Sequence, residues 1–391
     1  MKGNISFFIS FGVSFLVFFL LSFFLFLGYN QKNDYASFDI EVYSKVKVSD
    51  FLDKSIVRLV DDYYINTENV GNYKIDYSYY DEKGKITNSS FYLNIIDKEA
   101  PYVMLGNNYT HVIGNNFDLE KSLFYGDNVT KRPKVSIIGS YDLETVGEYP
   151  LIFRAEDDSG NVRDINFNLK VIEKKASTSS NSSYITFEEL NNRLPKNASL
   201  MIDVSKWQED IDWQEVYDNG IRYAMIRIGT QKGIDQDSRI DSYFEKNIIE
   251  AQKVGIKIGV YYFSYANDII EAKEQANWVV SILKEYSLDL PVAFDWECWE
   301  FFDDFNLNFY ELNKIADTFL KIIEDSGFAA LIYGSKNYIE NVWTYLDYDI
   351  WLAHYTKNTS YSGPMNMWQF TSSGKIPGIK GNVDVNFYYN K

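Results

Sequence analysis

Three acidic residues stand at the ends of apolar stretches in the second half of the chain. Asp203 follows the run 199–202, and Asp295 and Glu297 come at the end of the run 290–297. If these runs are strands, Asp295 and Glu297 point to the same face, about 6.5–7 Å apart along the strand. Burial and mutual repulsion should raise the pKa of one of the two carboxyl groups. A carboxyl group that keeps its proton near neutral pH can serve as a general acid, so the pattern favours acid catalysis.

A structural role is the alternative interpretation of the same residues. Asp295 and Glu297 could cap helices, or they could form buried ion pairs with Arg222 or Arg227. Two acids separated by one residue are too short a motif to decide between these roles.

The remaining composition narrows the chemistry. The 391 residues include one cysteine, Cys298, and two histidines, His111 and His354. These numbers exclude an internal disulfide framework and a thiolate metal cluster, and they leave little room for a histidine-ligated metal or a Ser-His-Asp triad. The formal net charge of −17 argues against nucleic acid as a partner. We therefore expect carboxylate chemistry without a cofactor or a metal ion. Cys298 is expected to be a buried hydrophobe, and His354 a packing or cleft-rim residue.

An α/β domain is expected to position the acids. Past residue 197, apolar strand-like runs alternate with amphipathic stretches such as 242–254 and 269–286. This alternation is typical of a parallel α/β fold, either doubly wound or a barrel. In both folds, functional residues gather at the carboxyl ends of the strands.

The N-terminal region has the composition of a membrane anchor. Residues 5–28 form a run of 24 residues without charge. A helix of that length spans about 36 Å, enough for a hydrocarbon core of about 30 Å. The run is longer than a usual signal-peptide core and lacks an A-x-A cleavage pattern. We expect an uncleaved signal anchor in the lipid bilayer. The positive-inside bias would place the residues after about 30 on the extracytoplasmic side of the cell membrane.

Residues 38–173 read as short strands and contain an internal repeat. The stretch 68–97 aligns without gaps on 144–173, with the turn glycines in register. The second copy resembles the bacterial immunoglobulin-like modules of surface proteins through Gly147, Tyr149, Ala155, Asp157, Gly160 and Asn161. We interpret both copies as spacers rather than ligand-binding modules.

The expected fold class is therefore multidomain. It comprises an N-terminal transmembrane helix, two all-β immunoglobulin-like sandwich modules and a C-terminal α/β TIM-like barrel. The corresponding ranges are 1–30 for the cytoplasmic stub and anchor, 31–99 and 100–173 for the modules, 174–197 for a Ser-rich linker, and 198–391 for the barrel.

The motifs of residues 198–391 resemble those of glycoside hydrolase family 25 muramidases. Residues 203–208 and 211–213 are similar to the family's opening D-V-S-x-W-Q-x-x-I-D-W. Further similar segments follow in the family's order: Gly259–Ser264, Asp295–Glu297, Ile350–Tyr355, Trp368–Phe370 and Ile379–Asn386. The sequence departs from the family at Glu209, where glycine is frequent, and in residues 229–234.

The resemblance implies a distorted barrel with fewer helices than strands, which hydrolyses the β-1,4 bond between N-acetylmuramic acid and N-acetylglucosamine in peptidoglycan. Carried over by position, Glu297 would be the general acid/base. Asp295 would stabilise charge on the sugar or orient its N-acetyl group. Asp203 and Asp384 would be supporting acids of the cleft. Two carboxylates on one strand do not form the usual opposed pair, so we expect participation of the substrate's own N-acetyl oxygen.

Aromatic residues are the expected substrate-binding groups, because sugar rings stack on aromatic planes. The candidates are Tyr262, Trp351, Tyr355 and Trp368. Trp296 is a weaker candidate, since strand alternation turns it away from the face of Asp295 and Glu297.

Two other functions remain open at this stage. The barrel could be a non-catalytic cell-wall-binding scaffold, although the presence of all four acids argues against this. It could also hydrolyse another N-acetylated glycan. The sequence lacks the D-x-x-D-x-D-x-E signature of chitinase-type barrels. A membrane tether with spacers would favour local remodelling of the wall.

Overall fold

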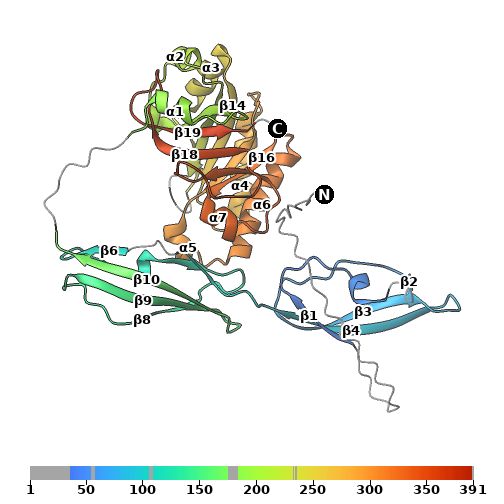
Figure 1. Ribbon diagram of the computed structural model, residues 1–391. Helices are drawn as coiled ribbons and strands as arrows, with labels where there is room; N and C mark the ends of the chain where they lie inside the picture. The colour runs from blue at the N-terminus through green and yellow to red at the C-terminus, as the bar shows by residue number, and fades with distance from the viewer. Residues whose placement is uncertain are drawn as a thin grey trace, which may run out of the picture. The chain divides into compact units, whose positions relative to one another are not determined.

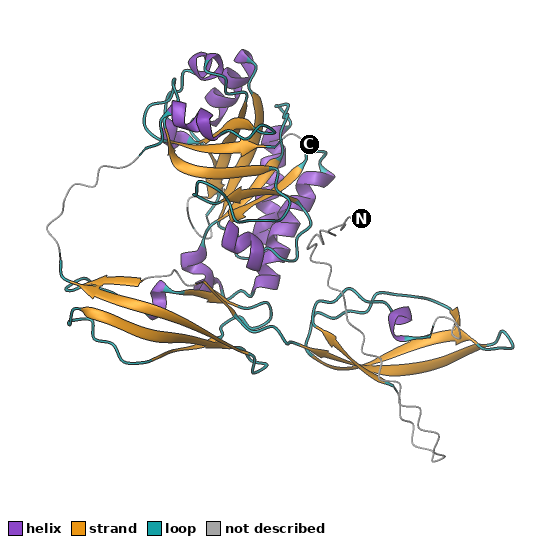
Figure 2. Cartoon of the chain, in the orientation of Figure 1, coloured by secondary structure: helices purple, strands orange, loops and turns teal. Residues whose placement is uncertain are grey.

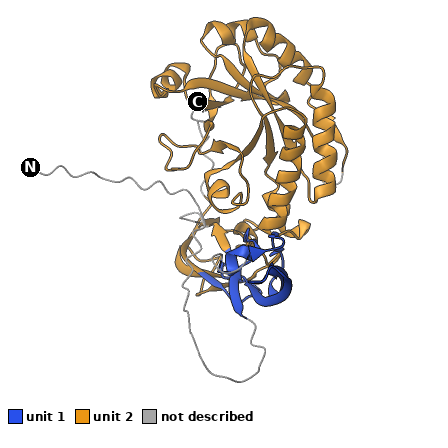
Figure 3. Ribbon diagram, turned by 90° about the vertical axis from the view of Figure 1, so that its right-hand side faces the viewer, with its two compact units in different colours: residues 1–101, 156–163 blue, residues 102–155, 164–391 orange. Residues whose placement is uncertain are grey.

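The computed structural model describes residues 36–53, 58–104, 109–174, 184–231, 233 and 236–389. They belong to two compact units, which Figure 3 distinguishes by colour. One unit contains the residues up to 101 together with 156–163, and the other contains residues 102–155 and those from 164 onward. The expected transmembrane run, 5–28, lies outside the described residues. None of the helices that the structure does describe is long and apolar enough to cross a membrane.

The sequence repeat corresponds to a repeated β-hairpin. Its first copy pairs β3 (Gly71–Tyr80) with β4 (Ile86–Ile96), and its second copy has β9 (Gly147–Glu156) and β10 (Val162–Ile172) at equivalent positions. The turn glycines of the two copies, Gly84 and Gly160, have φ values of 75° and 86°. Glycine adopts this left-handed backbone without the steric cost of a Cβ atom, which explains its place at both turns.

Each hairpin belongs to a single four-stranded sheet. The strand orders are β1-β4-β3-β2 and β6-β10-β9-β8, while β5 and β7 form a separate two-stranded sheet. An immunoglobulin-like sandwich packs two antiparallel sheets face to face, whereas β1–β4 and β6–β10 here are parallel pairs. The expectation of immunoglobulin-like sandwiches is therefore wrong. The other strands are β1 (Ser37–Glu41), β2 (Arg58–Leu59), β5 (Tyr102–Met104), β6 (Tyr109–Val112), β7 (Phe124–Gly126) and β8 (Lys134–Ile138).

The larger part of the second unit is a closed sheet with helices packed on part of its outer face (Figures 1 and 2). Its strand order is β11-β19-β18-β17-β16-β15-β14-β12-β13, and β11 also pairs with β12, which closes the ring. The strands are β11 (Ser199–Val204), β12 (Tyr223–Gln231), β13 (Ser238–Ile240), β14 (Lys257–Ser264), β15 (Val292–Trp296), β16 (Ala330–Ser335), β17 (Asp349–Ala353), β18 (Met367–Gly374) and β19 (Val383–Tyr388).

This barrel differs from the expected TIM-like architecture. A TIM barrel has eight parallel strands, each followed by a helix. Here β19 is antiparallel to both of its neighbours, β11 and β18. The connections 354–366 and 375–382, after β17 and β18, contain no α-helix. The expected fold class is thus wrong for the barrel as well, which is an α/β barrel of mixed strand direction. Its helices are α1 (Phe187–Arg193), α2 (Trp213–Asp218), α3 (Phe244–Val254), α4 (Ile269–Leu283), α5 (Phe302–Phe305), α6 (Phe309–Asp325) and α7 (Lys336–Asn341).

Two apolar cores lie on opposite sides of the barrel sheet. The larger one joins the outward-facing side chains to the helices and includes Leu190 of α1. Helix α1 falls inside the range expected for the linker, and a capping box between Thr186 and Glu189 stabilises its start. The smaller core includes Met201, Met225 and Trp351. These side chains fill the inside of the barrel below Asp203.

Candidate active site

The four acidic residues predicted from the sequence meet at one end of the barrel. Asp203 is near the end of β11, Asp295 is near the end of β15, and Glu297 follows β15 directly. Asp384 is near the start of β19, not its end. Because β19 is antiparallel to β11, its start lies beside the end of β11, and Asp384 is the register partner of Asp203. The reversed last strand therefore completes the cluster.

Burial and mutual repulsion raise the pKa of each acid in this cluster. Burial, offset in part by hydrogen bonds, raises the pKa of Asp203 to about 6. Burial, the charge of Asp203 and a hydrogen bond with it raise the pKa of Asp384 to about 8. For Asp295, burial raises the pKa most, followed by the negative charge of Glu297. The cluster thus holds protons at a pH where isolated carboxyl groups have lost theirs.

Asp295 and Glu297 differ in their access to solvent. Asp295 is buried, and its Oδ1 has no hydrogen-bond partner among the described residues. Glu297 is exposed, so a ligand can reach its carboxyl group. The walls around Glu297 nevertheless remove part of its hydration, and this desolvation, together with the charge of Asp203, raises its pKa. An accessible carboxyl group with a raised pKa has the properties of a proton donor.

A hydrogen-bond network fixes Asp203 at the floor of the site. Its Oδ2 accepts hydrogen bonds from Nδ2 of Asn386 at 2.7 Å and from Nε2 of Gln369 at 3.0 Å. The indole N–H of Trp351 donates to Oδ1 of Asn386 at 2.7 Å. The hydroxyl of Tyr355 donates to Oε1 of Gln369 at 2.8 Å. The sequence reasoning missed Gln369 and Asn386, although both lie in motifs that it quoted.

The two arginines considered as ion-pair partners of Asp295 and Glu297 bind other groups. Arg227 binds Asp241 through two nitrogens, at 2.6 and 2.8 Å. Arg222 donates to the backbone carbonyls of Tyr217 and Ile221. Arg227 still acts on the site from a distance, because its positive charge opposes the rise in the pKa of Asp295.

The four predicted aromatic residues occupy three different environments. Tyr355 is exposed, and the charges of Asp384, Asp203 and Glu297 add to the rise in its pKa caused by burial of its hydroxyl. Trp351 is buried inside the barrel beneath the acids, in contact with the ring of Tyr333 at 4.7 Å. These two residues are associated with the acid cluster.

Tyr262 and Trp368 are not part of this cluster. Tyr262 is fully buried in the outer core, where its ring stacks on Phe319 and its hydroxyl shares a hydrogen bond with Ser238. Trp368 is buried in the same core, and its indole N–H donates to the carbonyl of His354. Their side chains point outward from the barrel, away from the cluster. Trp296 is likewise buried in the outer core, as strand alternation predicted.

The remaining special residues have local roles. Nδ1 of His354 shares a hydrogen bond of 2.8 Å with the hydroxyl of Thr359, and burial lowers the pKa of the imidazole. Cys298 is buried, and burial raises the pKa of its thiol to about 12, so it is not a thiolate near neutral pH. The thiol of Cys298 also makes a hydrogen bond with the backbone of Glu297, its neighbour in the chain.

The opening motif separates into a part at the barrel mouth and a structural part. Just after Asp203, Ser205 and Gln208 form a capping box around a short 3-10 turn. This turn presents Trp207, whose side chain is 73% exposed. Asp212 caps the start of α2, and the buried Trp213 contacts Asn247. Trp207 is an aromatic candidate that the sequence reasoning did not select, although it lies in the motif.

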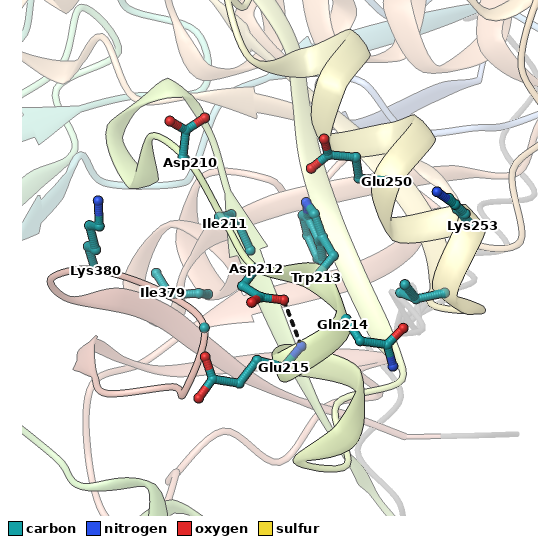
Figure 4. Close-up of a pocket in the computed structure, with 12 residues that line it drawn as sticks. Asp210, Ile211, Asp212, Trp213, Gln214, Glu215, Glu250, Lys253, Ile379 and Lys380 are labelled. Carbon is teal, nitrogen blue, oxygen red and sulfur yellow. Dashed lines mark hydrogen bonds between the residues drawn. The ribbon is translucent and has the colours of Figure 1, made fainter.

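A pocket of about 750 Å³ lies apart from the acid cluster, against α2 and α3 (Figure 4). Asp210, Glu215 and Glu250 face Lys253 and Lys380 around it, so its charges are mixed. None of the eight predicted site residues lines it. The acid cluster at the barrel mouth and this pocket are therefore separate features of the barrel domain.

The barrel domain is similar in sequence to known glycosyl hydrolases. The family model described as "Glycosyl hydrolases family 25" matches residues 202–379. The chain is also 32% identical over 205 residues to the uncharacterized protein YegX of Escherichia coli K12, with 50% of this chain and 72% of YegX covered. The chain belongs to glycosyl hydrolase family 25. It is a glycoside hydrolase, and the sequence prediction of an enzyme of this class is confirmed.

The chain is also similar to a lysozyme and to a solved structure of a family 25 glycosyl hydrolase. The chain is 25% identical over 193 residues to the "Autolytic lysozyme" of Clostridium acetobutylicum, with 47% of this chain and 54% of that protein covered. Among solved structures, it is similar to a family 25 glycosyl hydrolase from Bacillus anthracis. That match has 23% identity, a TM-score of 0.45, and coverage of 55% of this chain and 96% of the other.

Proposed function

We propose that this family 25 glycosyl hydrolase cleaves the β-1,4 bond between N-acetylmuramic acid and N-acetylglucosamine in peptidoglycan. The observation that carries the proposal is the accessible Glu297 beside the buried Asp295, both with a raised pKa, at the mouth of the barrel. The name of the Clostridium acetobutylicum relative, an autolytic lysozyme, supports peptidoglycan as the substrate.

The first step is proton transfer to the leaving group. Asp295 and Glu297 repel each other when both are ionised, so the pair retains a proton near neutral pH. Before substrate binds, the proton rests mainly on Asp295, whose pKa is raised more than that of Glu297. When an acetamido N–H of the substrate binds Asp295 and favours its carboxylate form, the proton passes to Glu297. Glu297 then donates it to the glycosidic oxygen as the bond from that oxygen to C1 breaks. The leaving sugar departs as a neutral alcohol, and Glu297 becomes a carboxylate.

The second group that we assign is Asp295. Its buried Oδ1, without a partner among the described residues, can accept a hydrogen bond from the N–H of the substrate's acetamido group. The acetamido oxygen then bonds to C1 and forms a cyclic oxazolinium ion, whose positive charge the Asp295 carboxylate stabilises. Water attacks C1 and reopens the ring, and its proton passes to Glu297, which restores the proton of the pair.

Replacement of the proton donor tests the assignment of the reaction. Purified peptidoglycan is digested with the full chain and with Glu297→Gln, and the new reducing ends are identified by mass spectrometry. We expect N-acetylmuramic acid at the new reducing ends and a loss of turnover of about 10²–10⁴-fold in the variant, the usual contribution of acid–base catalysis. Activity of the variant near the wild-type level would show that Glu297 is not the donor.

The stereochemistry of the product tests the participation of the acetamido group. Two displacements at C1 retain the configuration, so the first product should be the β-anomer. NMR of an early time point distinguishes the two anomers. Initial release of the α-anomer would contradict the oxazolinium route, while leaving the assignment of the cleaved bond intact.

We propose further that the enzyme works on the extracytoplasmic side of the cell membrane, with the uncharged run 5–28 attaching it there. The composition of this run supports membrane attachment. Fractionation of cells that express the full chain, compared with a chain that begins at residue 31, measures it directly. We expect the full chain in the membrane fraction and the shorter chain outside it, and equal distribution would refute the attachment.

A further inference from the structure

Two aromatic side chains of the second β-module, Tyr102 and Phe124, pack against the barrel's outer core. Phe124 is at the start of β7, yet its ring packs against rings of the barrel domain. The distances between ring centroids are 5.2 Å to Trp299, 5.8 Å to Phe302 and 6.3 Å to Phe309. Phe124 is one of the side chains packed on the barrel's apolar core, whereas the module's own core is a separate cluster. The module and the barrel belong to the same compact unit of the chain.

Polar contacts join the same two parts of the unit. The backbone N–H of Phe309, in the first turn of α6, donates to the carbonyl of Asp127 at 2.7 Å. The side-chain amide of Asn308 donates to the carbonyl of Val129 at 2.8 Å. The first N–H groups of a helix have no partner within the helix, so the module supplies one of the missing acceptors. The loop after β7 therefore fixes where α6 begins.

The module's loop is shaped for this contact. The carboxylate of Asp127 accepts hydrogen bonds from the backbone N–H groups of Val129 and Thr130, at 2.8 and 2.7 Å. A Cβ atom at Gly126 would collide with the ring of Phe309, so glycine allows the backbone to approach the ring closely. Arg132 reaches the backbone carbonyl of Asp303 in α5 at 2.9 Å.

The aromatic contact of Phe124 leads directly to the catalytic carboxyl group. Trp299 comes two residues after Glu297. Its ring stacks on that of Tyr338, with the ring centroids 3.6 Å apart, and packs edge-to-face with that of Trp296, with the centroids 4.7 Å apart. Glu297 lies between these two tryptophans in the chain. Its carboxylate accepts no hydrogen bond from the residues that the structure describes, so its position depends on its backbone and on the packing of its neighbours.

We propose that residues 124–132 of the second β-module position Glu297, by holding Trp299 and the start of α6 in place. The module is then a working part of the catalytic unit and not only a spacer. Phe124, at the centre of the aromatic contact, is the principal positioning residue. This inference rests on the proposed role of Glu297 as proton donor.

Steady-state kinetics of the full chain on soluble peptidoglycan fragments test the proposal. Phe124→Ala should lower kcat about tenfold or more, because a displacement of about 1 Å in a catalytic group costs as much as 10²-fold. The KM should stay within a factor of about two, since Phe124 packs in the outer core and is not one of the residues of the acid cluster. Phe124→Leu, which retains apolar bulk, should restore most of kcat.

The matched control is Tyr141→Ala, which removes an exposed aromatic side chain from the same module. It should leave both kcat and KM at wild-type values. An unchanged kcat in Phe124→Ala, a loss confined to KM, or an equal loss in Tyr141→Ala would overturn the proposal. If Phe124→Ala does not fold, Arg132→Ala tests the same contact from an exposed position and should lower kcat about twofold to threefold, a smaller displacement of the same group.

The wild-type protein and Glu297→Gln, measured on the same fragments, separate the two proposals. If the wild-type protein releases no product, the proposed function fails. If the wild-type protein is active, Glu297→Gln is inactive and Phe124→Ala equals the wild type, only the positioning role fails.

Discussion

Asp203 and Asp384 face each other across the antiparallel pair β11–β19, and their carboxyl groups share a hydrogen bond. Such a bond requires a proton on one of the two groups, because two carboxylates have no hydrogen to donate. The barrel therefore closes around a shared proton, and this proton links the stability of the fold to pH.

The first prediction concerns stability and pH. The folded-state pKa of Asp384 is raised from 3.8 to about 8, so its favourable contribution is complete below about pH 4 and is lost as the pH rises towards 8. We expect the free energy of unfolding to fall over this range. Asp384→Asn should flatten the fall and raise the Tm at pH 8 by about 2–4 °C, equivalent to about 1 kcal/mol. Thermal unfolding at pH 4, 6 and 8 measures both effects. An equally steep fall in the variant would contradict the assignment.

The second prediction concerns the pH dependence of activity. The negative charge of Asp203 contributes to the raised pKa of Glu297. Asp203→Asn removes this charge, so Glu297 should lose its proton at a lower pH. The alkaline limb of the kcat/KM profile should shift towards acid relative to the wild type. A shift in the opposite direction, or none, would mean that the limb reports another group.

The third prediction compares two tyrosines that were predicted to bind substrate. Tyr262 is buried in the outer core, whereas Tyr355 lies beside the acid cluster. Tyr262→Phe removes only the hydrogen bond with Ser238 and should lower stability by about 1 kcal/mol without changing kcat. Tyr355→Phe removes the hydrogen bond to Gln369, which in turn holds Asp203, and should lower kcat/KM about threefold to tenfold, the value of one lost hydrogen bond. Kinetics and denaturant unfolding of both variants are compared. Equal effects on activity would show that the assignment to two sides of the sheet is wrong.

The fourth prediction concerns the buried amide beneath the site. Asn386→Leu leaves the indole N–H of Trp351 without its acceptor and Asp203 without its shortest donor. The free energy of unfolding should fall by about 2–4 kcal/mol, since two buried polar groups lose a partner. Asn358→Leu, in an exposed loop, is the control and should change it by less than about 0.5 kcal/mol. Urea unfolding distinguishes the two.

The fifth prediction concerns the departure from the family in the opening motif. Glu209 adopts φ 52° and ψ −134°, a backbone that disfavours every residue with a Cβ atom. Glu209→Gly should therefore stabilise the protein by about 1 kcal/mol. Gln214→Gly, in helix α2, should instead destabilise it by about 1 kcal/mol. Loss of stability in both variants would show that the Glu209 side chain makes a compensating contribution.

The strands of the repeat could be predicted from the sequence because turn glycines and alternating residues mark their limits. The presence of four acids could be predicted from ordered motifs. The side of the sheet on which Tyr262 lies could not, because buried parallel strands such as Lys257–Ser264 are apolar on both faces and give no alternating signal. A register shift in β12 between Arg227 and Gly229 removes the remaining guide.

The contact of Phe124 with Trp299 also lies beyond sequence reasoning. Both residues belong to ordinary apolar stretches, and their meeting depends on the fit of two folded surfaces. The two modules have similar hairpins in sequence, but a repeat of strands says nothing about which copy packs on its neighbour. Residues 117–126 contain no motif that distinguishes them from a connecting segment.

The barrel is closed by strands from opposite ends of the domain, β11 at Ser199–Val204 and β19 at Val383–Tyr388. Contacts so distant in sequence form late, because the intervening chain must first be ordered. A nascent chain that has not yet supplied β19 has neither Asp384 nor the amide of Asn386 beside Asp203. If the proposed reaction needs these groups, the hydrolase gains its activity only when β19 has joined the sheet.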